Sequence, residues 1–563
     1  MKAEQRQIPT LRDRLALGGE RVTLKVIPQH PRTTPNPIEV TVKGPLHAGP
    51  VGPDLAVFDY DRERDRVHPP ATPGDGGGFP DYDLDDPRFH QLNAYAIAAG
   101  AIDLAEFELG RLLDWGFDGN RLIVLPHAGY LANAFYEEDT HSLQFYSFRQ
   151  ADGSIYHTSL VHDIVAHETG HALLDAVRDR YTEGNHRETA AIHEAVGDLA
   201  AVFAAFSHRV VREQFLASAG RTLRGPNMVA SIAEDFETSA DGALALRDLA
   251  APVDPQLFGQ TTDPHVLSLQ LTGAIWEALI RMYEVNLTRV DAEPAFKLAR
   301  TALQRMVVRA LDYLPPADAT FAEFASAIYR ADRFANPTDD HGYRAIVATV
   351  FADRGLIENA SDIADESDTK TAWPGLPPSW PRLTAAEAYV FLDQNRRRLA
   401  LSTQATYRDF VVRDLQVVSR PPDHTAIDAV VLSYEYPVDI ELDVARFGPL
   451  GGYWLPIWGG GTLVFDVDGR LRHHAEKPVT GDRVRDALRF VRSVADTSLV
   501  QVASTFEGRL LTRAMRAPYV ATVSADLVTV RGNPAARCGA RAPQPGAEVA
   551  GREAEAPRTE AAG

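Results

Sequence analysis

The sequence is poor in cysteine and in long apolar runs. Its single cysteine, Cys538, cannot form an internal disulfide bond in this chain of 563 residues. No apolar run approaches the roughly 20 residues that a membrane span needs. The first residues, MKAEQRQIPTLRDRLALGG, also lack the apolar core and the small-residue cleavage site of a secretory signal. Together these features predict a cytoplasmic protein without a transmembrane segment.

Positive charge is scarce as well. The sequence has 57 Lys and Arg against 77 Asp and Glu, a formal net charge of −20, and no basic patch stands out. Nucleic acid and anionic membranes both attract clustered Lys and Arg, so neither is predicted as a partner. The chain is longer than one hydrophobic core usually supports, which predicts roughly two to four domains.

Residues 162–198 carry the clearest chemical pattern. Within them, His167, Glu168 and His171 form an H-E-x-x-H motif between short apolar runs. Four residues make about one helical turn, so the two imidazoles project from one face and can share a tetrahedral Zn²⁺. Glu168 would then lean over the open coordination position, where a carboxylate can act as a base on metal-bound water.

A second helical pattern, at 188–206, carries Glu194 and Asp198 four residues apart on one face. Zinc hydrolases that take two histidines and one carboxylate need such a third ligand, and Glu194 can supply it while Asp198 accepts the outer N–H of a ligand imidazole. The alternative is a buried helical hairpin whose polar residues have no chemical role, and burying so many polar groups is costly. His193 lies about 100° around the helix from Glu194 and is predicted to face away from the metal as a surface or packing residue.

With these residues, the sequence resembles the thermolysin-like zinc metallopeptidases, the gluzincins whose third ligand is a glutamate. The resemblance spans roughly residues 90–355 and is strongest at 131–203. It implies one zinc per chain with His167, His171 and Glu194 as ligands, Glu168 as the general base, and Asp198 as the residue that orients an imidazole. It also implies an α+β fold with a β-containing N-terminal part and an α-helical C-terminal lobe.

The resemblance extends to substrate binding. Asn133-Ala134-Phe135-Tyr136 looks like the family's Asn-Ala-Phe-aromatic motif, and the following segment 142–148 alternates as an edge strand should. In the family this strand pairs with the substrate backbone, and the Asn side chain and Ala carbonyl, here Asn133 and Ala134, hold the residues that flank the cut. Ile164 and Leu246 match positions that line the pocket for the side chain after the cut, which implies a preference for apolar residues there.

Three further residues have family counterparts that act on the substrate, and each has an ordinary structural alternative. Tyr181 matches a tyrosine that helps to hold the oxyanion, but it can also be an amphipathic loop tyrosine. Arg247 matches an arginine that contacts a substrate carbonyl and the ligand carboxylate, or it is a helix-surface residue. His265 matches a histidine that donates a hydrogen bond to the oxyanion, often with an Asp nearby, here Asp263; the alternative is a capping or loop histidine.

The family's double calcium site is not expected in this chain. Asp163 matches one of its ligands, but Ala205 stands where the second helix should carry a carboxylate. Zinc is therefore the one cofactor predicted.

The chain divides by composition into five parts. Residues 1–80 are predicted to be a β-rich N-terminal segment, 81–357 the zinc metallopeptidase domain, and 358–381 a Pro-rich linker. Residues 382–531 read as a separate α+β accessory domain without a catalytic constellation, and 532–563 as a disordered tail. The pair His473-His474 in the accessory domain is predicted to be a solvated pair at a strand end.

The predicted function is a zinc-dependent peptidase that hydrolyses peptide bonds by Glu168-assisted attack of a zinc-bound water, with a peptide or protein as substrate. An endopeptidase that prefers apolar residues after the cut is the first choice. An exopeptidase or a hydrolase of another amide is the alternative among enzymes. A catalytically inactive, metal-stabilised binding or scaffold protein is the alternative from another class.

Overall fold

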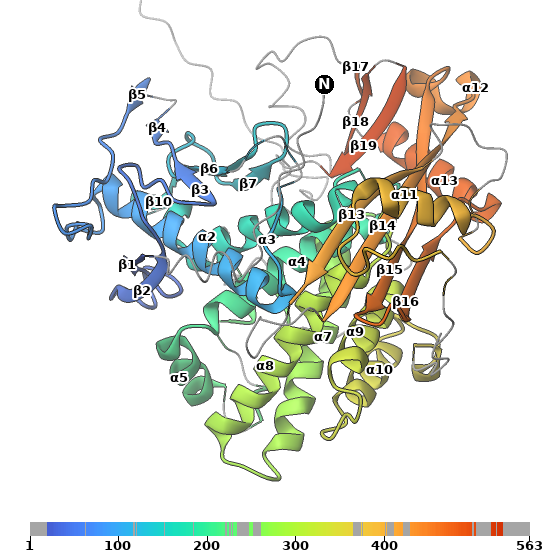
Figure 1. The fold of residues 1–563 in the computed structure, drawn as a ribbon. Coiled ribbons are helices and arrows are strands. Elements are labelled where there is room, and N and C mark those ends of the chain that lie inside the picture. Colours follow the sequence, from blue (N-terminus) through green and yellow to red (C-terminus); the bar gives the residue numbers. More distant parts are fainter. Residues whose placement is uncertain are drawn as a thin grey trace, which may run out of the picture.

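The structure is a computed structural model that combines helices and β-sheets (Figure 1). It describes residues 20–532 except 62–63, 116, 118, 120, 151, 184, 220–221, 225–226, 228, 233–246, 251–260, 364–372, 374, 400, 402–409, 420–427, 498–499, 503–518 and 525. Residues 364–372 and 374 of the predicted linker and all but the first residue of the predicted tail therefore lie outside the described residues.

The N-terminal strands belong to the same core as the metal-binding helices. β1 (Arg21–Val26) and β2 (Ile38–Lys43) form an antiparallel pair, and the inward side chains of β1 alternate with exposed ones as a half-buried strand requires. β3 (Leu55–Val57) pairs in parallel with β6 (Leu122–Leu125). The N-terminal segment predicted at 1–80 is thus not a separate unit, because its strand completes a sheet whose other strands come from beyond residue 80.

That sheet has four strands in the order β3-β6-β8-β7. β7 (Ala134–Glu137) forms one edge, while β8 (Ser142–Phe145) is paired on both sides, in parallel with β6 and antiparallel with β7. The prediction of an edge strand at 142–148 is therefore wrong: the strand that contains the Asn133 motif takes the edge, and the following strand is interior. The short strands β4 (Tyr60–Asp61), β5 (Arg66–Val67), β9 (Ser147–Arg149) and β10 (Ile155–His157) form two small hairpins beside it.

Helices α2 (Pro87–Leu109) and α3 (His162–Arg178) pack against this sheet. α2 begins after Asp86, whose carboxylate accepts the Arg88 N–H as an N-cap, and it ends at Gly110, which has a φ of 73°. The helices that follow α3 in this part of the chain are α4 (Arg187–Ala205), α5 (Arg209–Ser218), α7 (Pro264–Asn286), α8 (Ala292–Ala310), α9 (Phe321–Ala335) and α10 (Tyr343–Asp353).

α3 and α4 approach each other unusually closely because glycines meet at their contact. A Cβ added to Gly170 of α3 would lie 2.8 Å from the Cα of Gly197 on α4. No larger residue fits at that distance, so the two glycines set the spacing of the helices that carry the H-E-x-x-H motif and Glu194.

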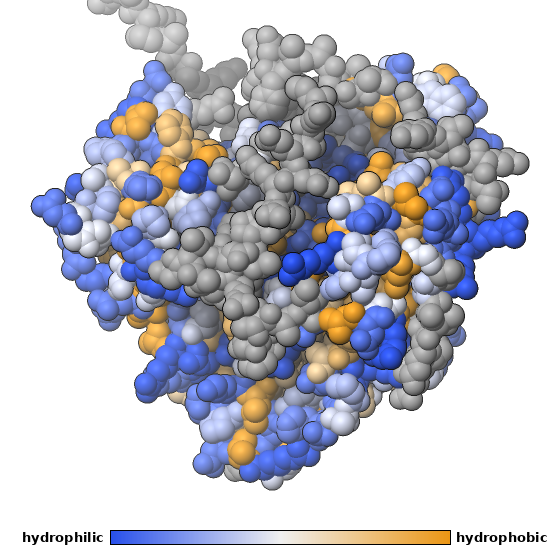
Figure 2. Space-filling view, viewed as in Figure 1, coloured by the Kyte–Doolittle hydropathy of each residue, from blue (hydrophilic) through white to orange (hydrophobic). Residues whose placement is uncertain are grey.

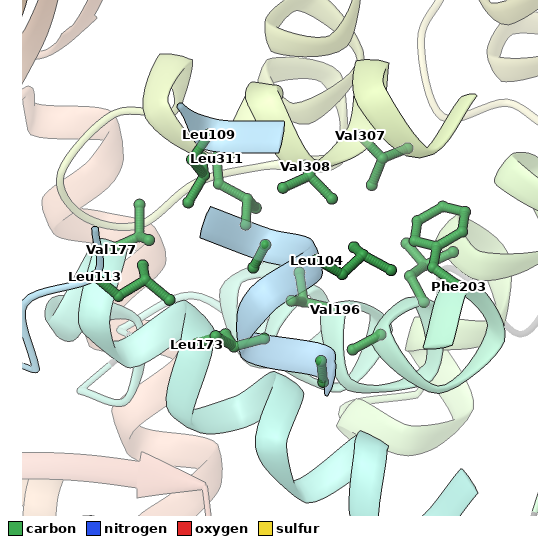
Figure 3. A pocket seen from close by; sticks show the side chains of 14 residues that line it. Leu104, Leu109, Leu113, Leu173, Val177, Val196, Phe203, Val307, Val308 and Leu311 are labelled. Carbon is green, nitrogen blue, oxygen red and sulfur yellow. The ribbon is translucent and has the colours of Figure 1, made fainter. Parts of the chain in front are cut away.

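An apolar cavity of about 40 Å³ lies between α2, α3, α4 and α8 (Figure 3). All of its lining side chains are apolar, among them Leu104, Leu173, Val196, Phe203 and Val308. An apolar cavity of this kind stays dry and offers nothing to orient a polar substrate. It is a packing gap behind the metal helices.

The C-terminal part contains a seven-stranded sheet in the order β13-β14-β15-β19-β18-β17, with β16 also paired to β15. Its strands and helices are β13 (Val411–Val418), β14 (Ala429–Glu441), β15 (Trp454–Asp466), β16 (Leu471–Lys477), β17 (Val500–Val502), β18 (Tyr519–Ser524), β19 (Leu527–Gly532), α11 (Ala385–Gln394), α12 (Val444–Phe447) and α13 (Gly481–Thr497). The turn between β15 and β16 falls at Asp468-Gly469, where Gly469 takes a φ of 75° that favours glycine.

This sheet packs directly against the metal-binding part. Val418, Val431 and Val464 belong to the same hydrophobic cluster as the buried residues of α3 and α4. The prediction that His473 and His474 form a solvated pair is also wrong. His473 is half-buried against the metal-binding part, and its Nε2 lies 2.8 Å from the carbonyl oxygen of Tyr313. Ion pairs cross the same contact, between Arg180 and Glu435, Lys477 and Glu323, and Arg483 and Asp318.

Within the described residues, no single helix has the length and apolar character to cross a membrane; α4 and α5 do so only when taken together, across a 99° bend. The face in Figure 2 is mainly hydrophilic, with scattered hydrophobic residues between.

Candidate metal centre

The H-E-x-x-H motif lies within α3, on a helix whose residues are almost all buried. The rings of His167 and His171 are 4.6 Å apart between centroids and perpendicular to each other. Their i, i+4 spacing places both on one side of the helix, as the sequence predicts.

α4 brings Glu194 to the same point. Its carboxylate oxygens lie 3.6 Å from His167 Nε2 and 3.9 Å from His171 Nε2. The three ligand atoms all lie within 4.8 Å of one another. Imidazole nitrogen and carboxylate oxygen bind zinc at about 2.0–2.2 Å, so donors at these separations can surround one ion after small adjustments.

The outer nitrogens of both imidazoles have partners on α4. His167 Nδ1 lies 3.0 Å from Asp198 Oδ1, as predicted, and His171 Nδ1 lies 2.7 Å from His193 Nδ1 with the two rings stacked. The prediction that His193 faces away from the metal is wrong. α4 packs so closely on α3 that a residue rotated about 100° from Glu194 still contacts it.

These contacts fix the proton positions that a metal would need. With Nε2 of His171 toward the ion, its Nδ1–H donates to His193, and the Asp198 carboxylate accepts from His167. Gly197 lies against the His167 ring: a Cβ added to Gly197 would lie 2.7–3.0 Å from three atoms of that imidazole. The donor set and its close support therefore fit a zinc ion.

Glu194 is held in its charged form. Burial by itself raises the pKa of its carboxyl, but the imidazoles of His265, His171 and His167 outweigh burial and hold the pKa well below the usual 4.5. It can therefore serve as an anionic ligand.

Glu168 connects the motif to the edge strand. Its Oε2 accepts the backbone N–H of Tyr136 in β7 at 2.9 Å, and the side chain is buried. The carboxylate predicted to be the general base thus lies beside β7, the edge strand of this sheet.

His265 reaches the site from the first turn of α7. Asp263 caps this helix by accepting the His265 backbone N–H at 2.9 Å, and its Oδ1 lies 3.3 Å from His265 Nδ1. The other ring nitrogen, Nε2, lies 3.4 Å from Glu194 Oε2. The structure therefore brings His265 to the predicted zinc ligands although more than 70 residues separate it from them in the sequence.

The predicted substrate residues lie at the same edge. Asn133 directly precedes β7 and is 2% exposed, and its side-chain nitrogen has no hydrogen-bond partner among the described residues. Ala134 begins β7 and pairs with Phe145 of β8 on its inner side. Ile164 is buried in the first turn of α3.

The structure contradicts the catalytic role predicted for Tyr181. Its ring is 1% exposed and its hydroxyl donates to the carbonyl oxygen of Pro315 at 2.8 Å. A hydroxyl has one proton, and here that proton is committed to the backbone. Of the two remaining predictions, Leu246 lies outside the described residues, and Arg247 is described only by its backbone in β12 (Arg247–Asp248).

No protein-family model matches the chain, and no curated protein does either. Among solved structures, the chain is similar to the precursor of protealysin, a metalloproteinase from Serratia proteamaculans, at 16% sequence identity and a TM-score of 0.37. The match covers 55% of this chain and 90% of that one.

Proposed function

We propose that this chain is a zinc-dependent endopeptidase of the gluzincin type, with His167, His171 and Glu194 as ligands of one zinc ion. The observation that carries the proposal is the convergence of these three donors from two helices, with Glu168 beside them. A bound zinc would polarise the scissile carbonyl and make a coordinated water more acidic.

Glu168 takes the proton of the attacking water and passes it to the leaving amine. Its carboxylate is suited to this because the N–H of Tyr136 holds it at the edge strand, where the peptide bond has to lie. A purely structural zinc site would need neither a buried carboxylate at that place nor an open coordination position. This favours an enzyme over a metal-stabilised scaffold.

β7 and its preceding residue bind the substrate backbone. An extended peptide can pair with the side of β7 on which no described strand lies, and the side-chain nitrogen of Asn133, a buried donor without a partner among the described residues, can donate to a substrate carbonyl. Pairing along an edge strand does not require a chain terminus, which favours an endopeptidase.

His265 stabilises the oxyanion that forms at the scissile carbonyl. Asp263 can accept the proton of His265 Nδ1 or hold a protonated ring, and Nε2 then points toward Glu194 and the metal position. Asp198 and His193 orient the ligand imidazoles and do not contact the substrate.

The test uses the full-length protein, with zinc measured by mass spectrometry and cleavage measured on a peptide library. We expect one zinc that depends on His171, and we expect Glu168→Gln to keep it while turnover falls by about 10² to 10⁴. Glu213→Gln, at an exposed glutamate on α5, is the matched control and should change neither quantity. Zinc content that is the same in wild type and in His171→Ala, or a Glu168→Gln variant with more than about a tenth of the wild-type turnover, would refute the proposal.

A further inference from the structure

A second histidine cluster lies apart from the α3–α4 site. His90 of α2, His127 of the loop after β6 and His157 at the end of β10 each place one ring nitrogen within 4.8 Å of the others. The elements that carry these residues are in the blue region of Figure 1, across the molecule from the C-terminal sheet. His90 and His127 are 2% and 8% exposed, so the cluster is an interior feature.

The outer nitrogens of two of these rings show where their protons are. His90 Nε2 lies 2.9 Å from the carbonyl oxygen of Leu84, and His127 Nδ1 lies 2.8 Å from Asp59 Oδ1. A carbonyl and a carboxylate can only accept, so both outer nitrogens carry a proton. In a neutral imidazole the inner nitrogen then carries no proton and presents a lone pair.

These two inner nitrogens, His90 Nδ1 and His127 Nε2, are 2.8 Å apart. Two lone pairs at this distance repel each other, so the arrangement calls for a cation. One extra proton would satisfy the pair, but it would not account for the third imidazole at the same point.

The third ring is arranged in the same way. His157 Nδ1 lies 2.8 Å from the hydroxyl of Ser147, which can accept its proton and leave Nε2 as the donor atom. Neutral imidazoles whose outer nitrogens are hydrogen-bonded to acceptors are the usual ligands of transition metals.

Asp59 is placed to orient His127. One of its oxygens accepts from His127 Nδ1, and the other accepts from the side-chain nitrogen of Gln91 at 2.8 Å. This is the carboxylate–histidine–metal arrangement that fixes the ring and raises the basicity of its inner nitrogen.

We propose that His90, His127 and His157 bind a second divalent metal ion, zinc by preference, and that Asp59 orients His127. Imidazole ligands suit zinc, copper and nickel, whereas calcium and magnesium prefer oxygen. Two nitrogens on a tetrahedral zinc are roughly 3.3 Å apart, so the close pair has to open by roughly 0.5 Å when the ion enters.

The ion would brace the segment that delivers the substrate strand. In the sequence, His127 precedes β7 and His157 follows β8. Ser147, the partner of His157, donates its backbone N–H to Gly129 and accepts that of Leu131, two residues before Asn133. An ion that joins the His127 loop and the end of β10 to α2 would fix the position of the segment that leads into β7. The role is structural, because two of the three ligands are buried and the nearby carboxylate, Asp59, is already bonded to His127 and Gln91.

An overlapping set, Asp59, His68 and His127, also places its donors within 4.8 Å of one another. In that set Asp59 and His127 would both be ligands, although they already bond to each other. It leaves the facing lone pairs of His90 and His127 unexplained, so we assign the ion to the set that contains His157. The two assignments differ in whether the ion depends on His157 or on His68.

The experiment begins with the full-length chain carrying His167→Ala and His171→Ala, so that the α3–α4 site cannot contribute. After reconstitution with Zn²⁺, this protein should still hold one zinc by mass spectrometry, and Co²⁺ should give the intense visible bands of a tetrahedral site. Adding His157→Ala should abolish the bands and reduce the bound zinc at least tenfold. His47→Ala, at an exposed histidine outside both sites, is the control and should change neither.

A further measurement does not depend on the folding of any added variant. Zinc should raise the melting temperature of the double variant by several degrees over the chelated protein, since binding to the folded state alone stabilises it. Absence of zinc, of cobalt bands and of this shift would overturn the proposal, as would loss of the ion in His68→Ala but not in His157→Ala. One zinc in the double variant and none at α3–α4 in the native chain would instead refute only the peptidase site.

Discussion

Tyr519 of β18 donates its hydroxyl proton to the backbone carbonyl of Thr262 at 2.9 Å, and Thr262 immediately precedes Asp263, the cap of α7. The C-terminal sheet is thereby attached to the turn that presents His265 to Glu194. Through this bond the C-terminal sheet supports the candidate site from outside.

Tyr519→Phe should therefore lower turnover while zinc content stays unchanged. A hydrogen bond of this kind is typically worth about 0.5–1.5 kcal/mol, which corresponds to about a two- to tenfold loss of kcat if the turn must stay in place for His265 to act. Steady-state kinetics with metal analysis measures both quantities. Tyr453→Phe, beside the C-terminal apolar cluster, is the control, and equal losses in both variants would show that the bond to Thr262 is unimportant.

Gly197→Ala should weaken zinc binding more than it weakens the fold. The added methyl would lie 2.7–3.0 Å from the His167 ring, which has to move and lose its contact with Asp198. Loss of such outer contacts usually costs about 10- to 100-fold in metal affinity, measurable by competition with a chromophoric chelator.

Gly100→Ala on α2 provides the matched control for this substitution. A Cβ at Gly100 meets nothing within 4 Å, so the exchange should leave zinc affinity unchanged and stabilise the helix by up to about 1 kcal/mol. Unchanged zinc affinity in Gly197→Ala would show that the ring is not held where the structure places it.

The contact of the C-terminal sheet with the metal-binding part should weaken in acid. Burial is the main cause that lowers the pKa of His473 to about 3, although its bond to the Tyr313 carbonyl acts in the opposite direction. Because the pKa of a histidine in the unfolded chain is about 6.5, the unfolded state takes up this proton first. Stability is thus fully present above about pH 6.5 and falls as the pH drops toward 3.

His473→Gln should make this pH dependence shallower by up to one proton, since the amide can still donate to Tyr313 and does not titrate. Urea unfolding of the chelated protein between pH 4 and 7.5 measures the slope. His47→Gln is the control at an exposed histidine. An identical slope in wild type and His473→Gln would mean that His473 is not buried in its neutral form.

The part of the site that the sequence predicts best is the part that depends on local geometry. His167 and His171 are one helical turn apart, and Glu194 and Asp198 repeat that spacing on the next helix, so two short periodic segments suffice to place four side chains. The prediction for His193 failed because helical angles describe one helix alone. How closely α4 approaches α3 depends on Gly170 meeting Gly197, a contact between two segments.

Features that depend on distant pairing were not predicted correctly. β6 pairs with β8 and not with β7, so β8 is an interior strand and β7 is the edge strand of the sheet. Tyr181 matches a family position, yet its hydroxyl donates a hydrogen bond to the carbonyl of Pro315, more than 100 residues away. The second histidine cluster has no local signature, because His90, His127 and His157 come from a helix, a loop and a strand end that only the fold brings together.

Specificity for the residue after the cut is the remaining consequence of the proposed peptidase site. Ile164 lies in the first turn of α3, three residues before His167, and is bulky and apolar. A pocket walled by it should favour Leu, Ile, Val or Phe, since each buried methylene is worth about 0.8 kcal/mol, or roughly a fourfold preference. Charged side chains should be rejected more strongly, because they would lose their hydration without gaining a partner.

A peptide-library cleavage map tests this directly, and Ile164→Val tests which residue sets the preference. Removing one methylene from the wall widens the pocket, so the ratio of cuts before Phe to cuts before Val should rise a few-fold. Ile346→Val on α10 removes the same methylene from a partly buried position of the helical layer and should leave the ratio unchanged. If wild-type protein cuts before Asp, Lys or Gly as often as before Leu or Phe, Ile164 does not line that pocket, although the zinc ligands and Glu168 would be unaffected by that result.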